Sequence, residues 1–488
     1  MRQYHFTCSI IGLVLLAVCA VQTAQAQRLL VGTATYAATG EIVGVYSNLV
    51  EVGGETGPRS IRLPGDAPLG FHLSQSRDLA AFTTGAPWKR SGGPPPPQPT
   101  LITVMSTAAA GEPASIISVE GWRQWAAGFV YDDVADAPYL IIAGARVDGY
   151  GTWRGRLDVR SIRSGPTLHA NSYSWPLPGP PVDVLPLSGG NEVVALCETS
   201  SREGMALLVL NAFNGRVFAE SRTDAGQRDE WALSPSALAL SMDFRQVLVS
   251  ATGYALDSPT GERITLLRLF DLSLTETAKP VEAPGMAVNG GTALSVAPDG
   301  RCWLATQSPD GRHGFVTAVE VRDGGLTKSL EVPLSGRGAP LIALAPAGGD
   351  VAVATQDVVE LWPRGVPGGA RRIQLDGPAT ALAWTSHGLF AGVGNELVAL
   401  PVADGVTETL SAFQNGRINH ITALPETPPA TDPVSGNALS GVPRLVLFQD
   451  VHQGHAVRKI PVDVGNNRWR VEFEDPVPPW FEVTPREG

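Results

Sequence analysis

Short apolar runs alternate with polar turns along almost the whole chain, and this pattern predicts β-strands. The clearest block has an apolar run at 293–296, a Pro-Asp-Gly turn at 298–300 and a second run at 302–306. Third and fourth runs follow at 315–321 and 329–332, separated by an Asp-Gly turn. Period-2 alternation and β-branched residues favour strands, and Asp-Gly turns are typical of hairpins. The block therefore predicts a sheet of four short antiparallel strands.

The same block recurs about every 50 residues. First strands are predicted to begin near Gly70, Ala127, Val182, Ala237, Ala293, Leu341, Ala381 and His420. Four short strands at this spacing are typical of a propeller blade, in which each sheet stacks on two neighbours as the ring closes. Several β-sandwiches in series, the competing fold, would need longer and less regular spacing. We therefore expect an all-β chain that folds as a single β-propeller of four-stranded antiparallel blades.

The number of blades depends on how the ring closes. Eight first strands favour eight blades, with seven blades as the alternative. Residues 28–66 have the pattern of second, third and fourth strands without a first. They are expected to share a blade with the C-terminal first strand near His420, as propellers often join their two ends in this way. The propeller is predicted over residues 27–475, followed by a Pro-rich C-terminal tail at 476–488.

Two segments resemble a known superfamily. The segment "ALSVAPDGRCWLAT" at 293–306 is similar to the first two strands of WD-repeat, YVTN-type and TolB-type blades, and residues 28–82 are similar to a YVTN repeat read from its second strand. In "ITLLRLFDLS", at 264–273, Phe270 and Asp271 stand where a WD repeat has Trp-Asp. The resemblance implies the propeller fold. It specifies no function, because this fold carries many.

Residues 1–26 predict a signal peptide. An apolar run at 10–21 is followed by Ala24 and Ala26, small residues at the positions that signal peptidase requires before the cleavage point. A lipoprotein anchored through Cys19 is the alternative. No second apolar run of membrane-spanning length follows. We therefore expect an exported protein, periplasmic or extracellular, whose mature chain does not insert into a membrane.

Composition agrees with this fold and argues against several kinds of partner. The chain has 488 residues, of which 43% are hydrophobic and 17% charged, with 54 Gly and 40 Pro. It is too apolar for a disordered protein, and hairpins account for the turn residues. The formal net charge is −11, or −12 once residues 1–26 are removed. An acidic exported chain is a poor candidate for nucleic acid or an anionic membrane surface. The sequence does not indicate an oligomeric state.

Candidate binding residues lie in the blade connections and in the loops between second and third strands, which the resemblance places on one face. The longest of these loops, at 85–99, 147–156 and 253–263, carry aromatic and charged side chains. Aromatic planes beside Arg or acidic groups suit sugars, peptides or small polar ligands. Taken singly, each residue also has a structural alternative, as packing between sheets or as a solvated side chain. The predicted binding residues are Trp88, Arg90, Arg123, Trp125, Tyr150, Trp153, Arg228, Asp229, Glu230, Trp231, Arg337, Asn419 and His420.

Other motifs do not predict chemistry. His452 and His455 would face opposite sides of a strand, so no metal site is predicted there. Cys197 and Cys302 lie in strand-like runs two repeats apart, and we expect two buried thiols rather than a disulfide. The sequence has no P-loop, EF-hand loop or G-x-S-x-G motif, and no cofactor is predicted.

The sequence thus favours an exported, non-catalytic β-propeller. It would act as a rigid platform for a protein or cell-surface ligand through its loop-rich face. The alternative is a propeller hydrolase, lactonase-like or glycan-processing, with a site at the mouth of the central channel. A lactonase-like site would need carboxylate, Asn or His ligands around one metal. The residues that could supply them are Asp229, Glu230, Asn289, Asn419 and His420.

Overall fold

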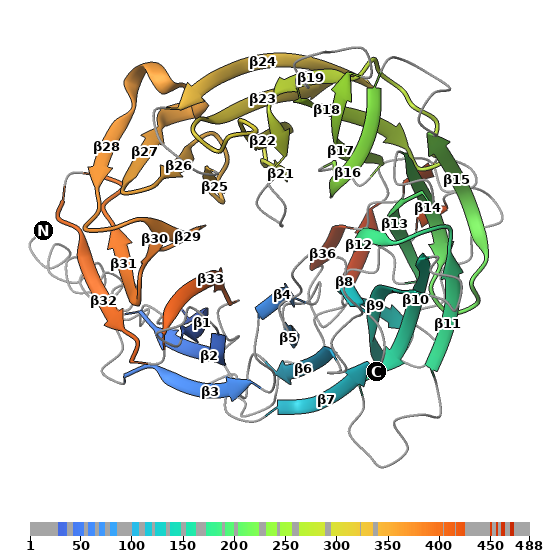
Figure 1. Cartoon of the computed structure of the whole chain (residues 1–488), viewed down its shortest axis with the longest axis horizontal. Helices are drawn as coiled ribbons and strands as arrows, with labels where there is room; N and C mark the ends of the chain where they lie inside the picture. The colour runs from blue at the N-terminus through green and yellow to red at the C-terminus, as the bar shows by residue number, and fades with distance from the viewer. Residues whose placement is uncertain are drawn as a thin grey trace, which may run out of the picture.

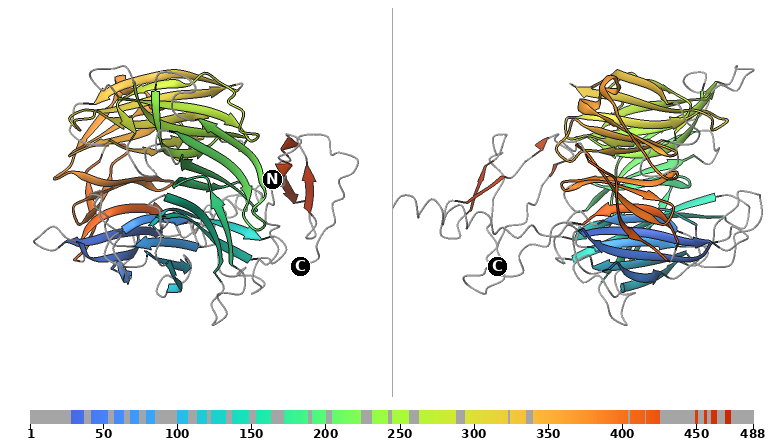
Figure 2. Two further views of the ribbon diagram at one scale, coloured as in Figure 1. Left: turned by 45° about the vertical axis from the view of Figure 1, so that its right-hand side comes forward. Right: turned by 90° about the vertical axis from the view of Figure 1, so that its left-hand side faces the viewer.

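The computed structural model shows a ring of β-sheets around a central axis (Figures 1 and 2). The predicted signal peptide, the 85–99 loop and the 476–488 tail lie outside the described residues. The described residues are 28–36, 42–52, 57–63, 68–73, 79–84, 100–106, 113–119, 123–132, 137–147, 153–162, 172–187, 191–199, 204–223, 231–241, 245–255, 263–287, 294–322, 324–334, 340–403, 405–414, 416–424, 449–450, 455–456, 460–463 and 469–472.

Each blade is an antiparallel sheet whose first strand lies nearest the axis and whose fourth lies at the rim. Blade one contains β4 (Pro68–Leu73), β5 (Leu79–Thr84), β6 (Thr100–Ser106) and β7 (Pro113–Val119). Blade two contains β8 (Arg123–Asp132), β9 (Ala137–Val147), β10 (Trp153–Ser161) and β11 (Ser172–Leu177). Blade three contains β12 (Pro181–Pro186), β13 (Glu192–Glu198), β14 (Met205–Asn211) and β15 (Val217–Thr223). Blade four contains β16 (Trp231–Leu240), β17 (Gln246–Ala255), β18 (Arg263–Asp271) and β19 (Val281–Pro284).

The inner strand of blade five is divided into two short pieces that both pair with β22. Blade five contains β20 (Met286–Ala287), β21 (Leu294–Val296), β22 (Arg301–Gln307), β23 (Gly314–Arg322) and β24 (Gly325–Leu334). Blade six contains β25 (Leu341–Leu344), β26 (Val351–Thr355), β27 (Val358–Trp362), the short 3-10 helices η1 (Pro363–Gly365) and η2 (Pro367–Gly369), and β28 (Arg371–Gln374). Blade seven contains β29 (Ala379–Thr385), β30 (Gly388–Val393), β31 (Glu396–Leu400) and β32 (Glu408–Ala412).

Blade eight closes the ring from both ends of the chain. Its inner strand is β33 (Arg417–Ala423), which pairs with β1 (Arg28–Tyr36), followed outward by β2 (Ile42–Glu51) and β3 (Arg59–Leu63). The eight-bladed propeller and this mode of closure are as predicted from the sequence. Outside the ring sheets, β34 (Gln449–Asp450) pairs with β35 (His455–Ala456), and β36 (Ile460–Asp463) with β37 (Trp469–Glu472).

Burial changes from the middle of each blade to its rim. The second and third strands of blade three are almost wholly buried, whereas its fourth strand β15 is exposed or half-buried throughout. The middle strands are covered on both faces by neighbouring blades, so both sets of alternating side chains are apolar. Burial on both faces leaves few positions for charged side chains, which accounts for the low charged fraction of the chain.

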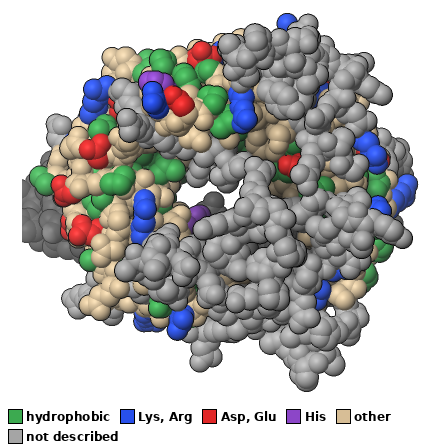
Figure 3. Space-filling model, in the orientation of Figure 1, with side chains coloured by type: hydrophobic (Ala, Val, Ile, Leu, Met, Phe, Trp, Pro, Cys, Tyr) green, Lys and Arg blue, Asp and Glu red, His purple; other side chains and the backbone are tan. Residues whose placement is uncertain are grey.

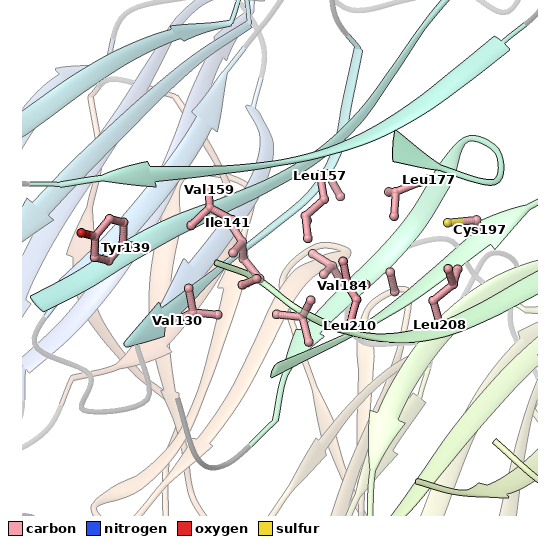
Figure 4. Packing of buried hydrophobic residues seen from close by; sticks show 14 of the residues in the cluster. Val130, Tyr139, Ile141, Leu157, Val159, Leu177, Val184, Cys197, Leu208 and Leu210 are labelled. Atoms are coloured by element: carbon pink, nitrogen blue, oxygen red, sulfur yellow. The ribbon is translucent and has the colours of Figure 1, made fainter. Parts of the chain in front are cut away.

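Apolar residues join each pair of neighbouring blades. Among the described residues there are eight buried clusters, and each combines side chains from two adjacent sheets. Figure 4 shows the cluster between blades two and three, where Ile141 and Leu157 face Val184 and Leu210. Because every sheet takes part in two such clusters, the ring is a continuous packed body. That rigidity fixes the positions of the loops.

Both cysteines of the described region are free and buried, as predicted. Cys197 lies in β13 and Cys302 in β22, and burial raises the pKa of each thiol far above its ordinary value. Thiols in this environment are inert toward oxidation and metals. In the described part of the chain, no helix has the length and apolar character needed to cross a bilayer.

Candidate functional site

The strand pairing defines two faces of the ring. In blade four, Trp231 at the start of the first strand pairs with Ala255 at the end of the second, and Tyr254 pairs with Arg263 at the start of the third. Blade connections and second-to-third loops therefore emerge at the same edge, as the resemblance implied. We call this edge the loop face. The opposite edge, with the first-to-second and third-to-fourth turns, is the turn face.

The structure places four of the predicted binding residues at the loop face by their backbone alone. Arg123, Trp153 and Trp231 are the first residues of β8, β10 and β16, and Trp125 lies two residues into β8. The remaining sequence candidates, apart from Asn419 and His420, lie outside the described residues. These are Trp88, Arg90, Tyr150, Arg228, Asp229, Glu230 and Arg337, together with Asn289 and His452.

A one-residue bulge occurs near the start of six of the eight inner strands, as far as the structure describes them. A bulge leaves one residue unpaired and re-aims its side chain. Trp125 and Asn419, both predicted binding residues, are two of these unpaired residues. The full set is Leu69, Trp125, Val182, Ser236, Thr380 and Asn419.

Asn419 differs from the bulge residue of the preceding blade in its hydrogen bonding. The hydroxyl of Thr380, in blade seven, donates to the carbonyl of Ile418 at 2.6 Å. The Nδ2 atom of Asn419 is buried and has no hydrogen-bond partner among the described residues. Its Oδ1 atom lies 2.7 Å from the point that a Cβ on Gly32 would occupy, so glycine at this position makes room for the amide. A buried polar group without a partner is costly, and on the inner strand of blade eight this makes Asn419 a candidate ligand contact.

His420 follows the bulge and forms a pair with His72 of the neighbouring blade one. Burial lowers the pKa of His72 to about 4. Burial, and then the positive charge of His72, lower the pKa of His420 to about 4. Both imidazoles are therefore neutral at physiological pH, when each ring offers one hydrogen-bond donor and one acceptor. Asn419, His420 and His72 are the polar group that we call the junction triad.

The position after the bulge in blade three has a structural role that the sequence did not reveal. There Asp183 accepts a hydrogen bond from the backbone N–H of Val184 at 2.9 Å and another from Leu238 of blade four at 3.0 Å. Burial raises the pKa of this carboxyl, while the two backbone bonds act in the opposite direction. Asp183 thus links two blades through a bond that only the ring geometry creates.

Two Asp-Gly motifs form turns, and the one at 299–300 was predicted from the sequence. The carboxylate of Asp299 accepts a hydrogen bond from the N–H of Arg301, and that of Asp310 from the N–H of Arg312. The glycine that follows each aspartate has a positive φ, 82° for Gly300 and 67° for Gly311. In the described part of the chain, no three His, Cys, Asp or Glu side chains come together as a metal-binding group.

The sequence did not identify His72, Asp183 or the tryptophans Trp303 and Trp362. The last two are fully buried between blades five and six, with ring centroids 6.3 Å apart. The available signal for His72 was its place two residues beyond Gly70 in a predicted first strand, which puts the two positions on the same face. Its partner His420 is remote in sequence, so only ring closure brings the two together. Figure 3 shows the central opening of this ring.

No family model matches the chain, and no curated protein matches it. Among solved structures, the chain is similar to the Dos1 propeller, with a TM-score of 0.48 and 11% identity over 73% of this chain and 87% of that one. It is also similar to the periplasmic gluconolactonase PpgL of Pseudomonas aeruginosa, with a TM-score of 0.42 and 15% identity over 72% and 97%.

A third similar structure is Chaetomium thermophilum Sqt1 bound to the N-terminus of ribosomal protein L10, with a TM-score of 0.43 and 11% identity over 73% of this chain and 87% of that one. These likenesses concern the fold alone. The chain is an eight-bladed β-propeller in architecture, as its own eight ring sheets establish.

Proposed function

We propose that this chain is an exported, non-catalytic β-propeller that binds a protein or cell-surface ligand through its loop face. The observation that carries the proposal is the junction triad, which combines a buried amide nitrogen without a described partner and two neutral imidazoles. Such groups suit the hydroxyls of a glycan or the amides of a peptide, because they exchange hydrogen bonds without a charge. The packed ring holds them in fixed positions.

Affinity capture with the mature chain tests this function. The bait, residues 27–488, is incubated with envelope extract of the source organism, and bound proteins and glycans are quantified by mass spectrometry. We expect at least one component whose capture falls roughly tenfold in both Asn419→Leu and His420→Gln. Val217→Ser, a change at a side chain that is 47% exposed in blade three, should leave that capture unchanged. The same set of components bound by all four proteins would contradict the proposal.

A lactonase-like hydrolase is the second candidate, and the imidazole pair is the observation that favours it. Neutral imidazole is the commonest protein ligand for transition metals. Elemental analysis of the purified mature chain separates the two functions. Stoichiometric metal that disappears in His72→Gln and His420→Gln, together with lactone hydrolysis lost in the same variants, would replace the platform with the enzyme.

A further inference from the structure

A pocket with a volume of about 360 Å³ opens on the turn face between blades six and seven. Leu361 and Trp362 at the end of β27 are buried and line its base, and the partly exposed Trp384 of β29 lines it from blade seven. The other lining residues belong to turns or to strand ends next to them: Asp350, Pro363, Arg371, Val402 and Ala403. The pocket is separate from the junction triad, because it is lined by blades six and seven, whereas the triad belongs to blades eight and one.

The indole of Trp362 has its polar atom satisfied within blade six. The Nε1 atom of Trp362 donates to Glu360 at 3.0 Å, and the same carboxylate accepts from Arg372 at 2.9 Å. The ring of Trp362 is fully buried against Trp303 of blade five, so the aromatic side chain that a ligand can contact is that of Trp384. Aromatic walls of this kind favour a large apolar side chain.

Exposed apolar side chains are concentrated in the turns beside the pocket. Four large hydrophobic residues are exposed among the described residues, and three of them belong to the third-to-fourth turns of blades six and seven. These three are Val366, Val402 and Val406, which are 55%, 44% and 89% exposed. Apolar residues gathered around one pocket are typical of a docking site, whereas isolated ones are not.

Arg371 and Asp350 line the pocket, and Arg364 lies in the adjoining turn next to Pro363. The guanidinium of Arg371 donates to the carbonyl of Ala403 across the two blades. Among the described residues, neither Arg371 nor the exposed Arg364 forms an ion pair with a carboxylate. The carboxylate of Asp350 is directed to the backbone, where it accepts the N–H of Arg364 at 2.8 Å. A ligand carboxylate would therefore find two guanidinium groups that no described carboxylate neutralises.

The turn that carries Arg364 is held in place before any ligand binds. Arg301 of blade five donates to the carbonyl of Arg364 at 3.0 Å and to that of Gly349 at 3.2 Å. Arg364 itself has a left-handed backbone, with φ of 54° and ψ of 25°, a conformation that costs energy for a residue with a Cβ. These contacts fix the rim of the pocket and reduce the ordering cost of binding.

We propose that this pocket docks a segment of a protein partner that inserts one large apolar side chain and carries an acidic residue beside it. The apolar side chain packs against Trp384 and Val402 in the pocket. The carboxylate is bound by Arg371 and Arg364. The site lies on the turn face, so this proposal goes beyond the proposed loop-face function and is tested independently of it.

Binding of labelled tetrapeptides to the mature chain tests this site. The probe is acetyl-Ala-Phe-Glu-Ala-amide with a fluorine on the phenyl ring, and binding is followed by 19F line broadening up to about 1 mM. We expect it to bind about fivefold more tightly than the same peptide with Gln in place of Glu. Val402→Glu should weaken the acidic peptide about fivefold, and Val402→Lys should keep or improve its binding.

Matched controls distinguish binding at this site from nonspecific hydrophobic binding elsewhere on the surface. Val217→Glu places the same charge on another exposed valine, in blade three, and should leave binding unchanged. Because Val402 and Val217 are 44% and 47% exposed, these variants should fold, and near-UV circular dichroism checks this. Equal binding to wild type and Val402→Glu, or no binding at about 1 mM, would overturn the proposal. So would equal affinity for free N-acetylphenylalanine, because the site would then take a small carboxylate rather than a protein segment.

Discussion

Blades three and eight begin their inner strands in the same way. Gly179 and Gly416 each stand four residues before an ionisable side chain, Asp183 in blade three and His420 in blade eight. A Cβ on either glycine would collide with the backbone of the second strand. In both blades a bulge residue immediately precedes the ionisable one. Gly179 and Asp183 therefore occupy the same places in their blade as Gly416 and His420 do in theirs.

The two blades use this shared position differently. Asp183 reaches the next blade and accepts the N–H of Leu238, so its polar atoms take part in holding the ring together. His420 instead lies near enough to a second imidazole, His72, for the charge of that ring to lower its pKa, and burial keeps both rings neutral. In blade three, the position after the bulge therefore links two neighbouring blades. Where it carries a neutral imidazole beside Asn419, the same geometry becomes a candidate site.

The largest expected effect is the acid sensitivity that the imidazole pair confers. The folded pKa of each histidine is about 4, below the ordinary value of 6.5, so the unfolded chain binds protons first as the pH falls. Their contribution to stability is complete above pH 6.5 and is lost as the pH falls toward 4. After allowance for solvent screening, we expect a loss of roughly 2 kcal/mol per histidine. Urea denaturation of wild type and of the His72→Gln, His420→Gln double variant across this range measures the difference.

The single variants sharpen this prediction. Because two positive imidazolium rings repel each other, protonation of one histidine lowers the pKa of the other. Each single variant, His72→Gln or His420→Gln, should therefore raise the pKa of the histidine that remains, as followed by NMR of the imidazole Cε1–H signals. Parallel stability curves for wild type and the double variant between pH 6.5 and 4 would show that the pair is not buried as described.

The next largest effect tests the structural half of the comparison. Asp183→Ala leaves the N–H groups of Val184 and Leu238 without an acceptor between two blades. We expect a loss of about 2–3 kcal/mol, because removing a charged acceptor leaves buried donors unsatisfied. Asp183→Asn keeps one acceptor and should lose about half as much. A loss below roughly 0.5 kcal/mol for the alanine variant in urea denaturation would mean that this link does not hold the blades.

Local pattern was enough to predict the ring. All eight predicted starts of first strands fall inside or within one residue of an inner strand, because hairpin turns and period-2 alternation are local signals. Closure through His420 also followed from the sequence, because residues 28–66 had no first strand of their own. Strands and turns depend on the residues within each segment, not on residues that are adjacent only in space.

The site was less predictable because it depends on register between distant strands. A bulge exists only relative to its partner strand, so the unpaired state of Asn419 could not be seen in the residues themselves. Asp183 was not singled out until ring closure placed Leu238 against it. Trp362 and Trp384 are separated by a whole strand and two turns, and only the packing of two blades places them around one pocket. The loops that carried most of the predicted binding residues lie outside the described residues.

The smallest expected effect on stability is at Asn419, and it decides whether the triad is a site or a second joint. Asn419→Leu keeps the size of the side chain and removes an amide whose nitrogen has no partner among the described residues, so stability should change by less than about 1 kcal/mol. Thr380→Val is the matched change at the bulge of blade seven, where the hydroxyl bonds Ile418, and should cost about 1–2 kcal/mol. Urea denaturation of both variants measures the difference between the two losses of stability.

If Asn419→Leu costs as much stability as Thr380→Val, the amide is a structural contact and the loop-face proposal loses its main support. If the two differ as expected, the chain retains at Asn419 a polar group that the fold does not need, which is the property of a ligand contact.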